Sequence, residues 1–340
     1  MREKLIFLRL LVLLSGLFAT HAFACEDVTV RDAAFTESRD VHRLCVIADA
    51  EDSAGRELYD RLEGWFETSG TGLNVELVRV DADDPEVRWD EYGIPSVPPS
   101  LPVTVLAGSR YAERRRFFID YWEPGPTLEN LESMSTSPAR DAMRTELVRR
   151  VAVLLYIPGT NGDAGSAEPV LDAVVKRWSS EVPLGLSVVR VDRSDERERL
   201  LLSFAGVEER GADWVAVVFG RGKLRPFLEG PEITEARLDE LIAPLVEGCT
   251  CLRPPSSLGV DIPMRWDESD DSAVVRLRAS GDAPGGPWGT SSTNPAGSSI
   301  VRRVMPAAMW TFGALALAVA IGTGAVIWIR NRGRDAPARQ

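Results

Sequence analysis

Two cysteines one residue apart form the most reactive short stretch of the sequence. Cys249 and Cys251, in EGCTC, follow a run of apolar residues at helical spacing. Such a pair could be a thiol–disulfide redox couple, a clamp for a soft metal such as Cu(I) or Zn(II), or part of a structural disulfide. The C-terminal end of a helix carries the negative end of the helix dipole and disfavours a thiolate, so the structural disulfide is the favoured interpretation.

Two further cysteines leave the connectivity open. Cys25 and Cys45 raise the total to four, an even number that suits an oxidising compartment. Cys45 lies inside an apolar run that predicts a strand, so it is either a buried core thiol or a partner for Cys25. A structural disulfide would join Cys249 to Cys251, or one of them to Cys25 or Cys45.

The rest of the chain offers little to complete a metal or catalytic site. Beyond the segment that precedes Cys25, His42 is the single histidine, and Met264 is the one additional soft ligand near the cysteine pair. The acidic stretches DADD (81–84) and DESDD (267–271) lack the glycine and spacing of an EF-hand loop. We therefore expect no metal and no cofactor. We interpret His42 as a polar strand-end residue, DADD as a helix cap and DESDD as a solvated linker.

The elements that would position these residues follow an internal repeat. VRVDADDPEVRWDEYGI begins at Val78, and VRVDRSDERERLLLSFAGV begins 111 residues further on, at Val189. Each copy lies within the same predicted order of strand, helix, strand, helix, hairpin and helix. The predicted strands are 43–49, 78–81, 102–107 and 114–122 in the first half, and 150–157, 186–192 and 214–219 in the second. This order predicts an α/β fold with a mixed sheet in each half, covered by helices on both faces.

This order of elements resembles the thioredoxin fold twice over. YGIPSVPPSLPVTVLAG, from Tyr92 to Gly108, is similar to the thioredoxin segment in which a Tyr-Gly-Ile helix end leads to a cis-proline before a central strand. The resemblance places Pro102 at that proline and implies a backbone site for an extended peptide. The alternative is that the four prolines of this stretch only stiffen a loop. In the second half ADWVAVVF has no proline before the strand, so no such site is implied there.

Thioredoxin catalysis requires Cys-x-x-Cys at the start of the first helix, where the helix dipole and free N–H groups stabilise a thiolate. The corresponding loops read IADAEDSAG in the first half and YIPGTNGDAGSAEP in the second, and neither contains a cysteine. Glu51 and Asp52 instead place carboxylates in the first helical turn, which stabilise a helix but oppose a thiolate. The glycine-rich second loop lacks the Gly-Lys-Ser/Thr of a phosphate-binding loop and is interpreted as a turn.

Most of the chain also resembles a set of bacterial membrane-anchored envelope proteins built from two degenerate thioredoxin-like repeats and a Cys-x-Cys element. The matching stretches are SPARDAM, VFGRGKL, and GCTC followed by GVDIPMRW. The resemblance implies an architecture rather than an activity.

Both ends of the chain predict an extracytoplasmic protein with a membrane anchor. Residues 1–24 have a basic start, an apolar core and an Ala-Phe-Ala end, which are typical of a secretory signal. Cleavage there would make Cys25 the new N-terminus, where lipidation is an alternative for this cysteine. Residues 304–329 contain no charge and would span about 39 Å as a helix, enough to cross a bilayer core of about 30 Å. The arginines that follow place the tail, 330–340, in the cytoplasm. The preference for Arg over Lys is typical of bacterial coding, so the domains are expected in the periplasm.

The expected organisation is therefore a first thioredoxin-like domain at 25–136, a second with Cys-x-Cys at 137–266, and a flexible stalk at 267–303 that leads to the transmembrane helix. A net charge of −12 argues against a nucleic-acid partner. The function we expect is a non-catalytic protein-binding or scaffolding module for other envelope proteins. The alternatives are a thiol–disulfide oxidoreductase that uses Cys249 and Cys251, and copper handling by the same thiols. Small residues at four-residue spacing in the anchor, Ala316, Ala320 and Gly324, suggest homo-association.

Overall fold

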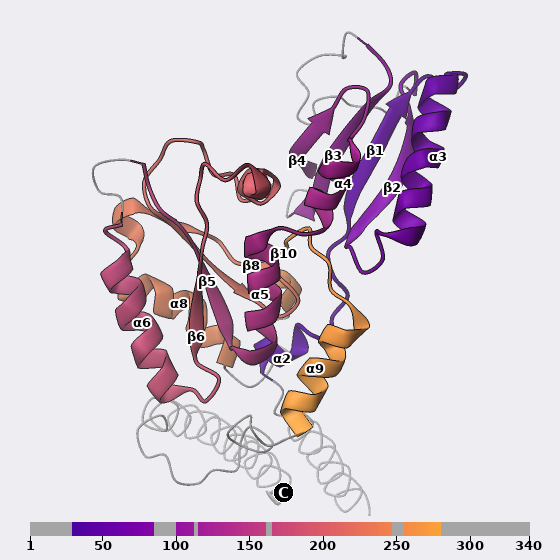
Figure 1. The fold of residues 1–340 in the computed structure, drawn as a ribbon. Coiled ribbons are helices and arrows are strands. Elements are labelled where there is room, and N and C mark those ends of the chain that lie inside the picture. The colour runs from indigo at the N-terminus through magenta and orange to yellow at the C-terminus, as the bar shows by residue number, and fades with distance from the viewer. Residues whose placement is uncertain (1–28, 85–99, 112–114, 161–164, 247–254, 280–340) are drawn as a thin grey trace, which may run out of the picture. The chain divides into compact units, whose positions relative to one another are not determined.

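The computed structural model describes residues 29–84, 100–111, 115–160, 165–246 and 255–279, which form two mixed sheets (Figure 1). The first sheet has the order β2-β1-β3-β4, in which β1 and β2 are parallel and the other neighbours are antiparallel. Its strands are β1 (His42–Ala48), β2 (Val75–Asp81), β3 (Val103–Tyr111) and β4 (Arg115–Trp122). Helices α3 (Ser53–Thr68) and α4 (Leu128–Ser135) pack on one face, against Leu44, Val46 and Leu106.

The second sheet repeats this arrangement. The order β6-β5-β7-β8 again has one parallel pair, β5 with β6, followed by antiparallel neighbours. Its strands are β5 (Ala152–Ile157), β6 (Leu186–Arg190), β7 (Trp214–Phe219) and β8 (Lys223–Leu224), extended by β10 (Val260–Asp261) beside β8 and by β9 (Leu228–Glu229) beside the start of β7. Helices α6 (Glu168–Glu181) and α8 (Glu235–Val246) cover one face, while α5 (Pro138–Arg149) and α7 (Arg199–Phe204) lie on the other. Each half therefore has the α/β thioredoxin-like fold expected from the sequence.

The helices bury apolar side chains that recur at helical spacing in the sequence. On α3 the buried side chains are Leu58, Leu62 and Trp65, and Phe66 packs against them. On α6 they are Leu171, Val174 and Trp178, and on α8 Leu238, Ile242 and Leu245. The GRGK turn between β7 and β8 requires its glycines, because Gly220 and Gly222 have φ angles of 57° and 100°.

A β-bulge in β4 contacts a helix of the second half. The pairing of β3 with β4 shifts register between Leu106 and Ala107, which leaves Ile119 as an extra residue on β4. The Ile119 carbonyl accepts a hydrogen bond from the Ser203 hydroxyl of α7, and next to it Asp120 pairs with Arg199 at 2.6 Å. The bulge thus turns an edge strand of the first sheet into a docking point for a helix of the second half.

The N-terminal segment of the described chain packs on the second half, although it precedes the first sheet in sequence. Val30 of helix α2 (Val30–Ala33) and the adjacent Ala34 belong to the core between the second sheet and α8. The buried Arg31 guanidinium donates to the carbonyls of Leu147, Val148 and Arg150 at the end of α5. The sequence pattern did not indicate this crossing.

A segment after the second sheet returns to the first half. Residues 260–266, which we call the strap, pair with β8 through β10 and with Leu73 through an isolated bridge at Arg265. Met264 and Trp266 are buried, and the Trp266 ring lies 5.7 Å from that of Phe35. The strap therefore contacts both halves.

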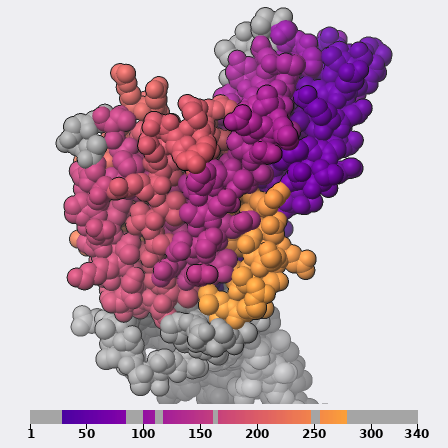
Figure 2. Space-filling model, viewed as in Figure 1, coloured from indigo at the N-terminus to yellow at the C-terminus, as the bar shows by residue number. Residues whose placement is uncertain are grey.

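The first part of the predicted stalk is a helix, which corrects the interpretation of DESDD as a solvated linker. Helix α9 (Glu268–Ala279) packs on α5, as Figure 2 shows in orange. The Asp270 carboxylate accepts from the backbone N–H of Asp267, and the Asp271 carboxylate accepts from the Trp266 indole. These aspartates stabilise the start of α9, and Val274 is the buried residue on its inner face.

Several predictions concern segments that lie outside the described residues. They include the signal 1–24, the remainder of the stalk, the span 304–329, the tail 330–340, and the side chains of Cys25, Cys249 and Cys251. In the portion of the chain that is described, no helix has the length and hydropathy required to cross a membrane.

The fully buried Arg140 holds the connection between α4 and α5. Its guanidinium donates to the carbonyls of Ser133, Met134 and Thr136, and also to the Pro263 carbonyl of the strap at 2.9 Å. Burial lowers the pKa of Arg140 to about 10, so it remains charged at neutral pH. A single side chain thereby satisfies the carbonyls at the end of α4 and fixes the strap.

Replacement of Arg140 should be strongly destabilising. We expect Arg140→Met to lower the free energy of unfolding by about 3 kcal/mol or more, because several buried carbonyls lose charged donors. Urea unfolding followed by tryptophan fluorescence measures the change. Arg144→Met on the same helix is the control. Arg144 forms only long ion pairs, with Asp141, Asp267 and Asp270 at 3.8, 3.6 and 3.8 Å, so its replacement should cost less than about 1 kcal/mol. Equal effects of the two substitutions would contradict this account.

Candidate functional site

The first half places Pro102 beside the loop where the thioredoxin fold carries its cysteines. Ile47 at the end of β1 pairs with Val103 at the start of β3, which sets Pro102 against the chain that leaves β1. The Leu101–Pro102 peptide bond is cis. Pro102 is buried and Leu101 half-buried, so Leu101 carries the more accessible part of this turn.

Asp52 begins α3 in this half. Its carboxylate accepts hydrogen bonds from the N–H groups of Ala54 and Gly55, both at 3.0 Å, and caps the helix. The N–H groups that would stabilise a thiolate are therefore bonded to a carboxylate that the chain itself supplies. Neither of these groups is left to polarise a sulfur atom.

In the second half Asp213 occupies the place that Pro102 has in the first. Ile157 pairs with Trp214 just as Ile47 pairs with Val103, so Asp213 lies beside the loop that follows β5. The buried Asp213 carboxylate accepts five hydrogen bonds from this loop and the end of β5. The donors are the Tyr156 hydroxyl (3.1 Å), Gly159 N (2.7 Å), Gly165 N (3.1 Å), the Ser166 hydroxyl (3.2 Å) and Ala167 N (2.9 Å).

These bonds determine the ionisation of the loop. Burial alone would raise the pKa of Asp213, but the N–H groups of Gly159, Ala167 and Gly165 outweigh it and hold the pKa below its usual value. Burial and the neighbouring Asp213 charge raise the pKa of Tyr156 to about 12. At neutral pH an anion is thus fixed beside the start of α6, next to the loop where a redox thioredoxin would carry its cysteines. The second half is closed at this place by its own side chain.

Cys45, the one cysteine among the described residues, lies at neither of these helix starts. Cys45 is buried in β1, in a cluster with Ile47, Val103 and Val105. Cys25, Cys249 and Cys251 lie outside the described residues, so their pairing and reactivity stay predictions. Within the described ranges no group of three or more His, Cys, Asp or Glu side chains is arranged to hold a metal ion.

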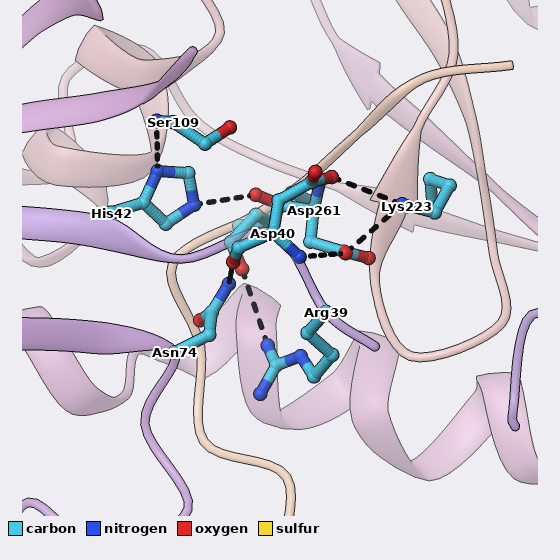
Figure 3. A network of polar contacts seen from close by, with 8 residues as sticks. Arg39, Asp40, His42, Asn74, Ser109, Lys223 and Asp261 are labelled. Atoms are coloured by element: carbon cyan, nitrogen blue, oxygen red, sulfur yellow. Dashed lines mark hydrogen bonds and ion pairs between the residues drawn. The ribbon is translucent and has the colours of Figure 1, made fainter. Parts of the chain in front are cut away.

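A buried network of charges joins the strap to the first half (Figure 3). The Lys223 ammonium of β8 lies 3.0 Å from the carboxylates of both Asp40 and Asp261. Each aspartate also donates its backbone N–H to the carboxylate of the other, at 2.8 and 3.0 Å. One cation and two reciprocally bonded anions therefore connect the segment before β1, the hairpin of the second half and the strap.

His42, Asn74 and Arg39 extend this network. The Nδ1 atom of His42 accepts from Ser109 N, so Nε2 carries the proton and donates to the Asp261 carbonyl at 2.7 Å (Figure 3). The Asn74 amide donates to the Asp40 carbonyl and accepts from Met264 N. The Arg39 guanidinium donates to the carbonyls of Gly72, Ile262 and Met264. His42 is thus a buried positioning residue with both ring nitrogens engaged.

The ionisation of the network follows from its burial and charges. Burial alone would lower the pKa of Lys223, but the Asp261 and Asp40 carboxylates raise it above its ordinary value. Burial opposes the ionisation of Asp40, but Lys223 and the bonds to Asp261 hold its pKa below the usual value. Burial raises the pKa of the more enclosed Asp261. The cluster is built to keep Lys223 charged.

Sequence reasoning did not identify Asp40, Asp213, Lys223 or Asp261 as functional or structural centres. The sequence did contain a signal for Asp213. It directly precedes the strand 214–219, as Pro102 precedes its strand in the other repeat, and a glycine-rich loop follows the strand 150–157. Lys223 also had a signal, because it is one of very few lysines in the chain and closely follows the apolar strand 214–219. The partners of Lys223 could not be read from the pattern, because they lie 183 and 38 residues away.

Comparison with known proteins gives no relative by sequence. No protein-family model matches the chain, and no curated protein matches it. Among solved structures, the chain is similar to the N-terminal domain of the alkylhydroperoxide reductase AhpF from Enterococcus faecalis, with 16% identity, a TM-score of 0.23, and coverage of 62% of this chain and 94% of that one. It is also similar to the first two thioredoxin domains of Eps1p from Naumovozyma dairenensis, with 12% identity, a TM-score of 0.25, and coverage of 61% and 92%. TM-scores this low carry no argument, so the assignment of a thioredoxin-like fold rests on the strand order described above.

Asp213→Asn tests the closure of the second loop. The charged carboxylate stabilises the fold above the pKa that it has in the unfolded chain, and this stabilisation is lost as the pH falls through its lowered folded value. We expect the substitution to reduce the melting temperature at pH 7 and to have little effect near pH 2. Scanning calorimetry across this range measures the difference, with the exposed Asp172→Asn of α6 as the control. A pH-independent difference would contradict the assignment.

Lys223→Met tests the network between the halves. Removal of the cation leaves two carboxylates enclosed without their partner, which should cost about 3–5 kcal/mol of unfolding free energy. Lys176→Met removes an exposed lysine from α6 and should change stability by less than about 0.5 kcal/mol. Both values come from urea unfolding. If the two variants are equally stable, the network does not hold the strap.

Proposed function

We propose that the protein is a non-catalytic, membrane-anchored module of the cell envelope that binds or scaffolds other proteins through redox-inactive thioredoxin-like domains. The observation that carries this proposal is the Asp213 carboxylate, which accepts five hydrogen bonds from the end of β5 and from the loop where a redox thioredoxin would carry its cysteines. Asp52 caps the equivalent helix of the first half. A fold in which Asp52 and Asp213 already accept hydrogen bonds from these N–H groups is suited to binding rather than to thiol chemistry.

The first half supplies the proposed peptide site. Its loop after β1 faces a cis-proline turn at Leu101–Pro102, whereas the corresponding turn of the second half is closed by Asp213. An extended peptide would meet the backbone of Leu101 and form main-chain hydrogen bonds there. The equivalent turn of the second half would not offer a peptide this same site, because Asp213 closes it.

The anchoring and location of this module rest on the sequence. The uncharged segment 304–329, the arginines after it and the signal-like segment 1–24 support a single span with the two domains on the periplasmic side. The partners would be other envelope proteins, and the stalk would hold the binding surface away from the membrane.

The experiment that tests the proposal compares binding with thiol chemistry in the full chain, purified in detergent. We expect no reduction of insulin by the protein in the presence of dithiothreitol beyond the rate of dithiothreitol alone, because neither loop carries a thiol at a helix start. Cys249→Ser combined with Cys251→Ser should leave this rate unchanged.

Two outcomes would overturn the proposal. An insulin-reduction activity that the double cysteine substitution removes would establish the alternative, an envelope thiol–disulfide oxidoreductase. Stoichiometric copper that the same substitution removes would establish copper handling by these thiols. For the peptide site, Pro102→Ala should weaken peptide binding about tenfold, which corresponds to 1.4 kcal/mol.

A further inference from the structure

Among the described residues, β6 is an edge strand of the second sheet, with no strand on its outer side. It pairs with β5 on one side, and it is the last strand in the sheet order. The Gly185 carbonyl accepts from Val151 N, and Val191 N donates to the Tyr156 carbonyl, so the residues at odd positions from 185 to 191 face β5. Because a strand alternates the side to which its backbone groups point, Leu186, Val188 and Arg190 direct their N–H and C=O groups outward. Such a row of outward groups is a template for an added strand.

An apolar hollow lies beside this edge. It has a volume of about 320 Å³ and is open to solvent between β6 and the first turns of α5. Its apolar lining comes from Pro138, Ala139, Ala142, Val188, Val189 and Val191. Val188 as a residue is 38% exposed, an unusual value for an aliphatic residue in this sheet. A single aliphatic side chain from an added strand fits a hollow of this size and lining.

The exposed carboxylate of Asp192 lies at the end of the hollow next to the C-terminus of β6. Glu198 is buried and accepts from the Ser137 hydroxyl and Ala139 N, and Asp195 pairs with Arg197 at 2.6 Å. Asp192 lies at the same end, and its carboxylate accepts only from the N–H and hydroxyl of Ser194 among the described residues. These two bonds lower the pKa of Asp192, which keeps it ionised.

The remaining charge of the edge is already neutralised. Arg190 pairs with Glu168 and lies over the Tyr156 ring at 5.3 Å. The edge therefore offers an incoming segment three things: outward backbone groups, an apolar hollow, and the exposed Asp192 carboxylate, which forms no ion pair among the described residues. This combination is complementary to an extended segment that carries an aliphatic residue and a cationic residue.

We propose that the β6 edge binds an extended segment of a partner polypeptide as an additional strand, with an aliphatic side chain in the hollow and a Lys or Arg against Asp192. This inference rests on the proposed binding function and names a second site for it, separate from Pro102. Main-chain hydrogen bonds to Leu186, Val188 and Arg190 provide affinity, and the hollow and Asp192 provide selectivity.

The test begins with a phage-displayed library of random dodecapeptides, selected on the full chain in detergent. The selected sequences are expected to alternate apolar and polar residues and to carry Lys or Arg. Binding of fluorescein-labelled synthetic copies is then measured by fluorescence anisotropy. Hydrogen exchange with and without peptide should show slowed exchange at the amides of Leu186, Val188 and Arg190.

The decisive variant is Val188→Pro, which replaces an outward N–H by a ring that obstructs strand addition and breaks no bond to β5. We expect it to weaken peptide binding by at least about tenfold. The matched control is Leu77→Pro, since Leu77 has the same outward position on the β2 edge of the first repeat and pairs with Leu44 as Val188 pairs with Leu154. This control should leave affinity within about twofold.

Asp192→Asn is a second variant that does not risk the fold, because Asp192 is exposed and the amide oxygen can still accept from Ser194. It should weaken binding by about two- to fivefold, the range of an exposed ion pair. The β6 site is wrong if Val188→Pro and Asp192→Asn bind the peptide with the parent's affinity, and if the amides that the peptide protects from exchange lie outside β6. If Pro102→Ala abolishes that binding, the proposed function stands without the β6 site. If the library yields no binding peptide, both fail.

Discussion

Buried charge must be satisfied by partners of opposite sign or by hydrogen bonds, and this constraint organises the molecule. Lys223, enclosed between two carboxylates, fixes the strap to the segment before β1. Arg140 is satisfied almost entirely by backbone carbonyls, including one from the strap. Asp213 is satisfied by the donors of the loop after β5. At each of these places one ionised side chain determines the path of a loop or connection that has little regular structure of its own.

The same constraint separates the two repeats. In the first, the chain after β1 lies against a proline and the helix start is capped locally by Asp52. In the second, a carboxylate at the proline's position ties the loop, the strand end and the helix start together. A strand order shared by both halves therefore supports two different surfaces, and fold alone does not determine what each half does.

Much of the fold could be predicted from the sequence, because it depends on local periodicity. Runs such as 150–157 and helix faces such as Leu238 and Ile242 gave the strands and helices, and the Val78 and Val189 matches gave the repeat. Helix α9 was not predicted, because its aspartates are typical of a solvated linker. The contacts that order this helix come from Trp266 and from α5. Charged residues that are buried by distant partners, such as Lys223 and Arg140, carry no periodic signal. Their role is set by tertiary contacts across the chain.

The crossing of α2 has a consequence for how such a chain can be divided. Residues before the first sheet complete the core of the second half, and residues after the second sheet close the first. A cut between the repeats would leave each fragment without a piece that the other retains. Deletion of one repeat would therefore expose apolar surface on the half that remains.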